Sequence, residues 1–207
     1  MVEINGEYGC MGDLGLHALH IPIRSGWLPH RVFASLSKIV TERPDGQGKM
    51  VPCKTWDNAT IICDVDHPTE KYNFPMTIKT YRIAPGETDT WYIEVIGTEF
   101  SARYSTKYPK SLYTMHYKNG GKQEWRCEDL GHTSVYKTIT GSIFEFGFTD
   151  AILQMWAAFI DEFTNPHKKM HFGCVTPQET LLQHQILTAA LESGKAGTTI
   201  SLNIESV

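Results

Sequence analysis

The sequence predicts an α+β fold in which helices cover one face of a predominantly antiparallel, open-faced sheet. Segments rich in β-branched and aromatic residues occupy the middle of the chain and are joined by short turns, which favours antiparallel pairing. Two long helical patterns follow these segments, so strands and helices do not alternate along the chain. The sequence also lacks Gly-x-Gly-x-x-Gly, the glycine pattern that opens a Rossmann fold. A doubly wound parallel sheet is therefore not expected.

The first expected element is a short helix between Gly12 and Pro22. Asp13 suits the N-cap or first turn, and Pro22 limits the helix at its far end. On an ideal helix Asp13, His17 and His20 fall within an arc of roughly 60°, and the other positions are mostly apolar. Burial of the apolar sides leaves this polar stripe facing solvent or a polar cleft.

A β pattern runs from about Lys38 to Cys127. Four segments are expected to be strands, namely residues 60–65, 76–83, 91–96 and 112–117. The sequence Asn119-Gly120-Gly121 predicts a tight turn, after which residues 123–127 return as the second strand of a hairpin.

Two helices and a short strand are expected to close the chain. Apolar residues recur at helical spacing over residues 152–163, which predicts a helix that faces the core and stops at Asn165-Pro166. The sequence Thr176-Pro177-Gln178-Glu179 predicts a capping box, and Gly194 is the expected end of that second helix. Alternation over residues 200–204 predicts a final half-buried strand.

Length and composition are those of an ordinary globular domain. The 207 residues are 41% hydrophobic with a net charge of −4, which suits one domain over residues 1–207 and argues against nucleic-acid binding. The longest apolar stretch, residues 151–160, is shorter than the ~20 residues of a membrane span. The N-terminus resembles no secretory signal, so we expect the cytoplasm. Five cysteines without Cys-x-x-Cys indicate reduced thiols.

The stripe of Asp13, His17 and His20 is the main candidate site, and it has three interpretations. Asp13 can be a helix cap followed by partly exposed histidines. Alternatively, a carboxylate one turn before an imidazole orients it for general-base catalysis. The third interpretation is a metal site, but the helix would have to direct three side chains to one point, and we assign no metal.

Three further residues are weaker candidates for substrate binding. Lys79 and Arg82 fall on opposite faces of one expected strand, so at most one of them faces a shared cleft, and either can be a solvated charge. Trp125, together with His132 beyond the hairpin, can stack on and orient a sugar ring, or it can be a packed tryptophan.

Several segments resemble the glucose-fructose oxidoreductase and inositol dehydrogenase family, called Gfo/Idh/MocA. Residues 12–17 resemble the Asp-x-x-x-His motif that opens its catalytic helix. Residues 91–102 resemble a strand, Gly-Thr turn and strand, residues 140–148 resemble the lead into a long helix, and residues 176–193 resemble the closing helix. The resemblance covers nearly the whole chain.

This resemblance implies the C-terminal domain of an oxidoreductase whose N-terminal Rossmann domain is absent from this chain. His17 would take the proton of a substrate hydroxyl, and Asp13 would orient His17 or the substrate. The family motif does not account for His20, which we expect to contact the substrate. NAD or NADP would be bound mainly by the absent domain, which also carries the family's catalytic lysine. Sugars or polyols are the implied substrates, and the sheet face is the implied surface of a homodimer or homotetramer.

Without its own dinucleotide fingerprint, the chain is expected to be inactive alone and to be part of a longer enzyme. The alternative is a non-enzymatic module that dimerises through its sheet or binds carbohydrate.

Overall fold

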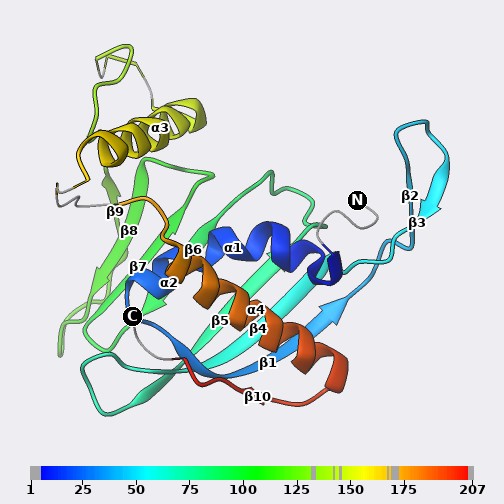
Figure 1. Ribbon diagram of the computed structural model, residues 1–207. Coiled ribbons are helices and arrows are strands. Elements are labelled where there is room, and N and C mark those ends of the chain that lie inside the picture. The colour runs from blue at the N-terminus through cyan, green and yellow to red at the C-terminus, as the bar shows by residue number, and fades with distance from the viewer. Residues whose placement is uncertain are drawn as a thin grey trace. The chain divides into compact units, whose positions relative to one another are not determined.

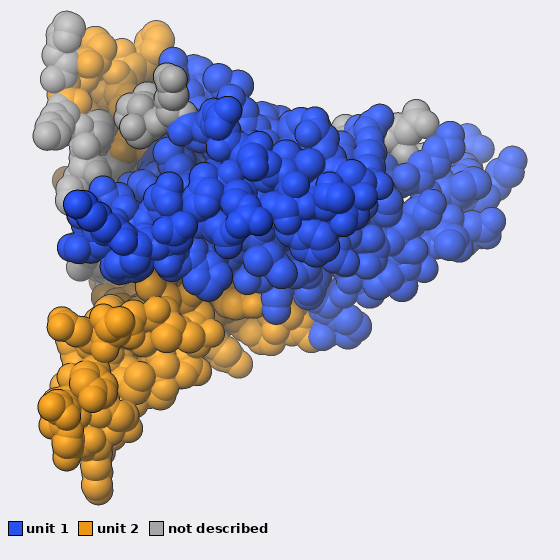
Figure 2. Space-filling model, turned by 90° about the horizontal axis from the view of Figure 1, so that it is seen from below, with its two compact units in different colours: residues 1–85, 175–207 blue, residues 86–174 orange. Residues whose placement is uncertain are grey.

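The computed structural model describes residues 6–131, 134–141, 143–144, 146–166, 168 and 173–204. The chain divides into two compact units, coloured separately in Figure 2. Unit 1 comprises residues 1–85 and 175–207, and unit 2 comprises residues 86–174. Each unit is described by itself below, and the expectation of a single domain stays a prediction.

Unit 1 is built on a four-stranded antiparallel sheet with the strand order β10-β1-β4-β5. The helices of this unit cross one face of the sheet (Figure 1). The strands of the sheet are β1 (Pro29–Ser37), β4 (Asn58–Asp66), β5 (Asn73–Tyr81) and β10 (Ile200–Ser201). The helical elements are η1 (Gly6–Tyr8), η2 (Met11–Gly15), α1 (Leu16–Ala18), α2 (His20–Arg24) and α4 (Pro177–Ala196). The predicted class of helices on one face of an antiparallel sheet is confirmed.

The core of unit 1 lies between this sheet and α4. Side chains alternate along the strands, so that Val32, Ile61 and Ile78 face the helices and are buried. Helix α4 supplies the other side of the core through Leu182, Ile186, Leu187, Ala189 and Ala190, all of them buried. Every residue of the buried apolar cluster belongs to unit 1.

The opposite face of the sheet is open. Phe33 and Ile62 are directly opposed across β1 and β4, and both are exposed. Lys79 and Tyr81 of β5 point to the same face, where the Tyr81 hydroxyl lies 3.0 Å from the Thr60 hydroxyl.

Strand β1 was not predicted. It begins at Pro29, well before the β pattern expected from Lys38. Val32, Ala34 and Leu36 face the core, but the apolar Phe33 lies between Val32 and Ala34 and interrupts the alternation of apolar and polar residues. Strand β5 also begins earlier than expected and includes Pro75, which is tolerated because β5 lies at the edge of the sheet. The final strand β10 is shorter than predicted.

The first helical segment differs from the expected single helix. Its start, η2, is a turn of π-helix with Cys10 at the N-cap, so Asp13 takes the first-turn position, the second of its two predicted places. Pro22 does not end the segment either. It lies in the first turn of α2, where backbone N–H groups have no partner within the helix, so proline is tolerated there.

Helix α4 continues past its predicted end. Gly194 lies inside the helix, where it packs against β1. A Cβ at this position would lie 2.5 Å from the Leu36 side chain, so the close packing requires glycine. The helix ends instead at Gly197, which adopts the left-handed conformation with φ of 68°.

Unit 2 holds a second antiparallel sheet with the order β6-β7-β8-β9, and one long helix, α3 (Phe148–Thr164). The strands are β6 (Tyr92–Ile96), β7 (Phe100–Ser105), β8 (Ser111–His116) and β9 (Arg126–Asp129). The predicted hairpin is confirmed as the β8–β9 pair. Its return begins later than expected, because the Gln123 side chain donates to the Lys118 carbonyl within the loop.

Helix α3 has the predicted extent, but the prediction that it faces the core is wrong within the described residues. Trp156, Phe159 and Phe163 are 55%, 51% and 80% exposed. The polar side of α3 forms hydrogen bonds with a loop of the same unit. The Gln154 side chain bonds to the backbone of Tyr136, and the Tyr136 hydroxyl donates to the Asp161 carboxylate. These polar contacts orient the apolar stripe away from its own unit.

A two-stranded ribbon of β2 (Glu42–Pro44) and β3 (Met50–Pro52) connects β1 to β4. No described helix is both long and apolar enough to cross a membrane.

We predict that Gly9→Ala destabilises the protein by more than Gly6→Ala. The two glycines share a left-handed φ of 55° and 54°, which costs about 1–2 kcal/mol for alanine. Only Gly9 is closely approached, because a Cβ there would lie 2.4 Å from the Trp56 carbonyl oxygen. Urea unfolding should therefore show a loss on the order of 3 kcal/mol for Gly9→Ala. Equal losses would show that the Trp56 contact relaxes.

Thiol reactivity should follow burial. No disulfide joins the five cysteines, all of which lie among the described residues, and Cys127 is exposed. Burial raises the pKa of Cys10, and raises that of Cys63 to about 12, so little thiolate forms at neutral pH. Iodoacetamide at pH 8 should alkylate Cys127 in the native protein, and Cys10 and Cys63 only after unfolding. Peptide mapping showing early modification of Cys63 would contradict this order.

Candidate functional site

Asp13 is positioned by the π-helical turn η2 and pairs with an arginine. Its Oδ2 lies against Nη2 of Arg82, the residue that follows the end of β5. Both side chains are partly exposed. The structure therefore brings together two of the predicted site residues, and it places the Asp13 carboxylate opposite a cation.

His17 lies on α1 and is exposed. Among the residues that the structure describes, no side chain forms a hydrogen bond or ion pair with His17. The predicted arrangement, in which Asp13 orients His17, is therefore not formed here, because the carboxylate of Asp13 is paired with Arg82. The His17 ring is free to meet a ligand.

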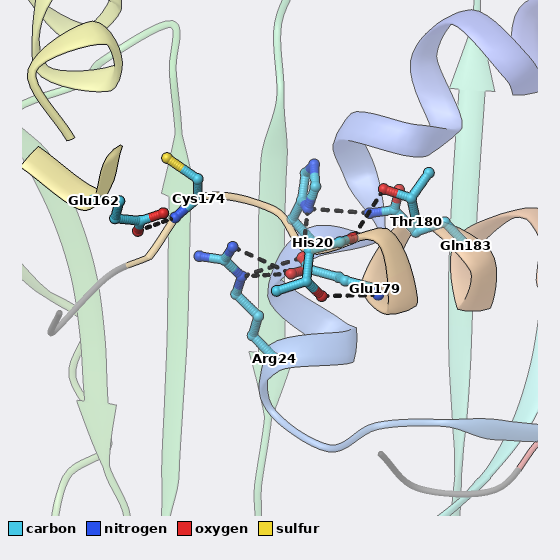
Figure 3. Close-up of polar contacts among 8 residues, drawn as sticks. His20, Arg24, Glu162, Cys174, Glu179, Thr180 and Gln183 are labelled. Carbon is cyan, nitrogen blue, oxygen red and sulfur yellow. Dashed lines mark hydrogen bonds and ion pairs between the residues drawn. The ribbon is translucent and has the colours of Figure 1, made fainter. Parts of the chain in front are cut away.

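His20 is the imidazole that a carboxylate orients. Its Nδ1 lies 2.7 Å from Oε1 of Glu179, which is on α4, and 3.0 Å from Nε2 of Gln183, one turn further along (Figure 3). Glu179 and Gln183 are only 9% and 2% exposed, whereas the His20 side chain is 30% exposed. One edge of the ring is thus held in the interior.

Arg24 anchors Glu179 from the next turn of α2. Its Nε lies 3.1 Å from Oε1 and its Nη2 lies 3.2 Å from Oε2, so the guanidinium contacts both oxygens. A two-oxygen contact of this kind is strong and directional. His20 and Arg24 stand four residues apart on α2, so both reach the same carboxylate.

The predicted capping box of α4 is only half formed as a result. The Glu179 backbone N–H donates to the Thr176 hydroxyl at 3.1 Å, as a capping box requires. The Glu179 carboxylate turns away to His20 and Arg24 instead of returning to the Thr176 backbone. Three of the four residues in this group around His20 were not predicted as site residues, namely Arg24, Glu179 and Gln183. Glu179 was interpreted only as a cap, although the i, i+4 spacing of His20 and Arg24 was visible.

Lys79 and Trp125 are not joined to these groups. Lys79 lies on the open face of the unit 1 sheet, opposite the face that carries the helices. Trp125 belongs to unit 2, where the Arg103 guanidinium stands 3.6 Å from the centre of its ring. That face of the indole is therefore already covered by a cation, which Glu94 holds at 3.1 Å. His132 lies outside the described residues.

The described residues of unit 1 line a cavity and a groove. A cavity of about 60 Å³ beside Arg82 is lined by Cys10, Arg43 and Asp57 among others, and it has room for a few water molecules. A groove of about 360 Å³ runs between α4 and residues 200–204, and none of the predicted site residues lines it. Among the described residues, no group of three or more His, Cys, Asp or Glu side chains is arranged to hold a metal ion.

No protein-family model and no curated protein sequence matches this chain. Solved structures do match it by fold. An oxidoreductase domain protein from Kribbella flavida superimposes with a TM-score of 0.73 at 16% identity, over 95% of this chain and 52% of its own. Levoglucosan dehydrogenase in complex with NADH and L-sorbose gives 0.72 at 17% identity, over 96% and 51%.

A third match is the super-repressor mutant of Gal80p from Saccharomyces cerevisiae, with a TM-score of 0.63 at 16% identity, over 97% of this chain and 51% of its own. The chain thus spans about half the length of the structures that it matches. These neighbours are Gfo/Idh/MocA-type oxidoreductases and their structural relatives. The predicted resemblance in fold is confirmed, and it agrees with a C-terminal domain of that type.

We predict that Arg24→Met destabilises the protein by about 1–3 kcal/mol, because it leaves the buried carboxylate of Glu179 without its cation. Arg31→Met is the matched control. It breaks the Arg31–Asp64 pair, whose side chains are 53% and 44% exposed, and should cost about 0–1 kcal/mol. Chemical denaturation compares the two variants. Equal losses would mean that the carboxylate is rehydrated when Arg24 is removed.

Proposed function

We propose that this chain is the substrate-binding and catalytic domain of an NAD(P)-dependent oxidoreductase that moves a hydride between nicotinamide and a sugar or polyol hydroxyl. The observation that carries the proposal is the match of nearly the whole chain to dehydrogenases, one of them solved with NADH and L-sorbose. The exposed His17, on the helical segment that carries the Asp-x-x-x-His motif, supports the same function.

In this proposal His17 takes the proton of the substrate hydroxyl, and the hydride on the same carbon goes to the nicotinamide. The free ring of His17 suits a base that meets substrate directly. Asp13 and Arg82 form a paired carboxylate and guanidinium that offers both an acceptor and donors to substrate hydroxyls. His20 is proposed to contact the substrate, and Lys79 and Trp125 remain weaker candidates for the same role.

The cofactor is proposed to be NAD or NADP, bound mainly outside this chain. The described residues do not fit a dinucleotide cradle. Gly9, Gly12 and Gly15 precede or enter the first helical segment, but Gly9 is closed by the Trp56 backbone and Gly15 by the Leu187 side chain. A phosphate site needs open backbone N–H groups at such a turn.

The open face of the unit 1 sheet is proposed as the contact of a homodimer or homotetramer. Phe33, Ile62 and Tyr81 give this face an exposed apolar patch, which suits contact with a second copy. The five free thiols suit a reducing compartment, and we place the protein in the cytoplasm.

A non-enzymatic module is the second candidate function. Two observations favour it. Asp13 is paired with Arg82 instead of orienting His17, and one protein of this fold is a super-repressor mutant of Gal80p. Such a module would form a stable dimer through the sheet or bind sugar weakly, with no dependence on a nicotinamide cofactor.

The test uses the protein captured from its host at its native mass. Reduction of NAD or of NADP should be seen with a sugar or polyol, and His17→Ala should lower kcat by about 10²- to 10⁴-fold, as expected for loss of a general base. His184→Ala is the control, since His184 is an exposed histidine on α4 that touches the Tyr8 ring.

Unchanged kcat in His17→Ala would remove His17 from the mechanism. A native mass near 23.4 kDa, with cofactor-independent sugar binding and no reduction of either nucleotide, would favour the non-enzymatic module.

A further inference from the structure

The His20 ring meets two polar neighbours at the same atom. Nδ1 lies 2.7 Å from a Glu179 oxygen and 3.0 Å from the Gln183 side-chain nitrogen. A ring nitrogen carries either a hydrogen or a lone pair, so it cannot donate to the carboxylate and accept from the amide together. The carboxylate is the stronger partner because it is charged. Nδ1 therefore carries the hydrogen, and a half-turn of the Gln183 amide presents its oxygen to the same N–H.

The hydrogen on Nδ1 decides the chemistry of the other ring nitrogen. In a neutral imidazole the second nitrogen, Nε2, must carry the lone pair. The Nδ1 edge is held against the buried Glu179 and Gln183, and the His20 side chain is still 30% exposed. Nε2, which has no partner among the described residues, is the acceptor that His20 can offer to a ligand.

We infer that Glu179 is a positioning residue, which holds His20 in the Nδ1–H form so that Nε2 accepts a hydrogen bond from a hydroxyl of the bound ligand. The ligand class rests on the proposed function, because a sugar or polyol presents hydroxyl donors. The positioning itself rests only on the contacts of Glu179, Arg24 and Gln183 with one another and with His20.

The position of the Glu179 carboxylate costs free energy that helix capping alone would not require. Glu179 gives up its return bond to the Thr176 backbone, and its carboxylate is nearly buried, which requires the Arg24 contact to offset desolvation. An ion pair that only joins α2 to α4 would need Arg24 and Glu179 but not the imidazole. The short Nδ1 contact and the second neighbour Gln183 both fix the orientation of the His20 ring.

The first test reads the tautomer of His20 in the full chain, by long-range ¹H–¹⁵N correlation of the imidazole rings. The His20 signals are assigned by their loss in His20→Gln. We expect Nδ1–H in the native protein and in Glu179→Gln, which keeps an acceptor. Glu179→Met, which removes the acceptor, should shift the ring to Nε2–H, the form that free imidazole side chains prefer in water.

Glu192→Met is the matched control, because Glu192 is an exposed glutamate of the same helix. It should leave the His20 tautomer unchanged. Nε2–H in the native protein, or Nδ1–H retained in Glu179→Met, would overturn the inference. The measurement on the native chain needs no substitution, so it decides the question even where Glu179→Met fails to fold.

The second test adds levoglucosan or L-sorbose to the same samples. The Nε2 resonance should move in the native protein and in Glu192→Met, and the apparent affinity should fall about tenfold in Glu179→Met, the effect of one hydrogen bond. A sugar that shifts other resonances but leaves Nε2 unmoved would overturn the ligand role of His20 alone. No shift anywhere, with no activity of the native-size protein, would overturn the proposed function and the ligand role with it.

Discussion

The structure of unit 1 depends on how closely α4 approaches the sheet and the first helical segment. Gly194 lets the helix come within contact of Leu36 on β1, and Gly15 admits the Leu187 side chain at the other side. Small or missing side chains at these crossings allow buried residues such as Ile186 and Ala190 to fill the space above the strands. Helix α4 thus completes the core above β1 and β4, and a Cβ at Gly194 would lie 2.5 Å from the Leu36 side chain, so a larger residue there would require the helix or Leu36 to move.

The same approach determines the candidate site. Because α4 lies beside α2, a carboxylate from its first turn reaches His20 and Arg24, more than 150 residues earlier in the chain. Asp13, which shares an ideal helical stripe with both histidines, is instead drawn to Arg82 by opposite charge at the end of β5. Two carboxylate–cation pairs therefore flank the helical segment, and the His17 ring between them has no polar partner among the described residues. This division gives the segment one oriented and one free imidazole.

Unit 2 obeys a different constraint. Its described sheet buries only small polar residues, Ser101 and Thr114, and its helix α3 bonds to its own loops through Gln154 and Asp161. With polar residues satisfied on that side, the large apolar residues of α3 remain exposed. Helical periodicity shows that a helix has an apolar side, but it does not show what that side meets.

The sequence by itself determined the fold class, the two closing helices, the hairpin and the recognition of the fold, because local periodicity and turn residues carry that information. It failed for β1, where the exposed apolar Phe33 interrupts the alternation, and for the helix ends expected at Pro22 and Gly194, where packing overrules residue preference. Only the tertiary structure decided which carboxylate serves which imidazole. Asp13 and His17 are neighbours by spacing, yet Arg82 and Glu179 come from distant strands and helices, and electrostatic pairing follows distance in space instead of separation along the chain.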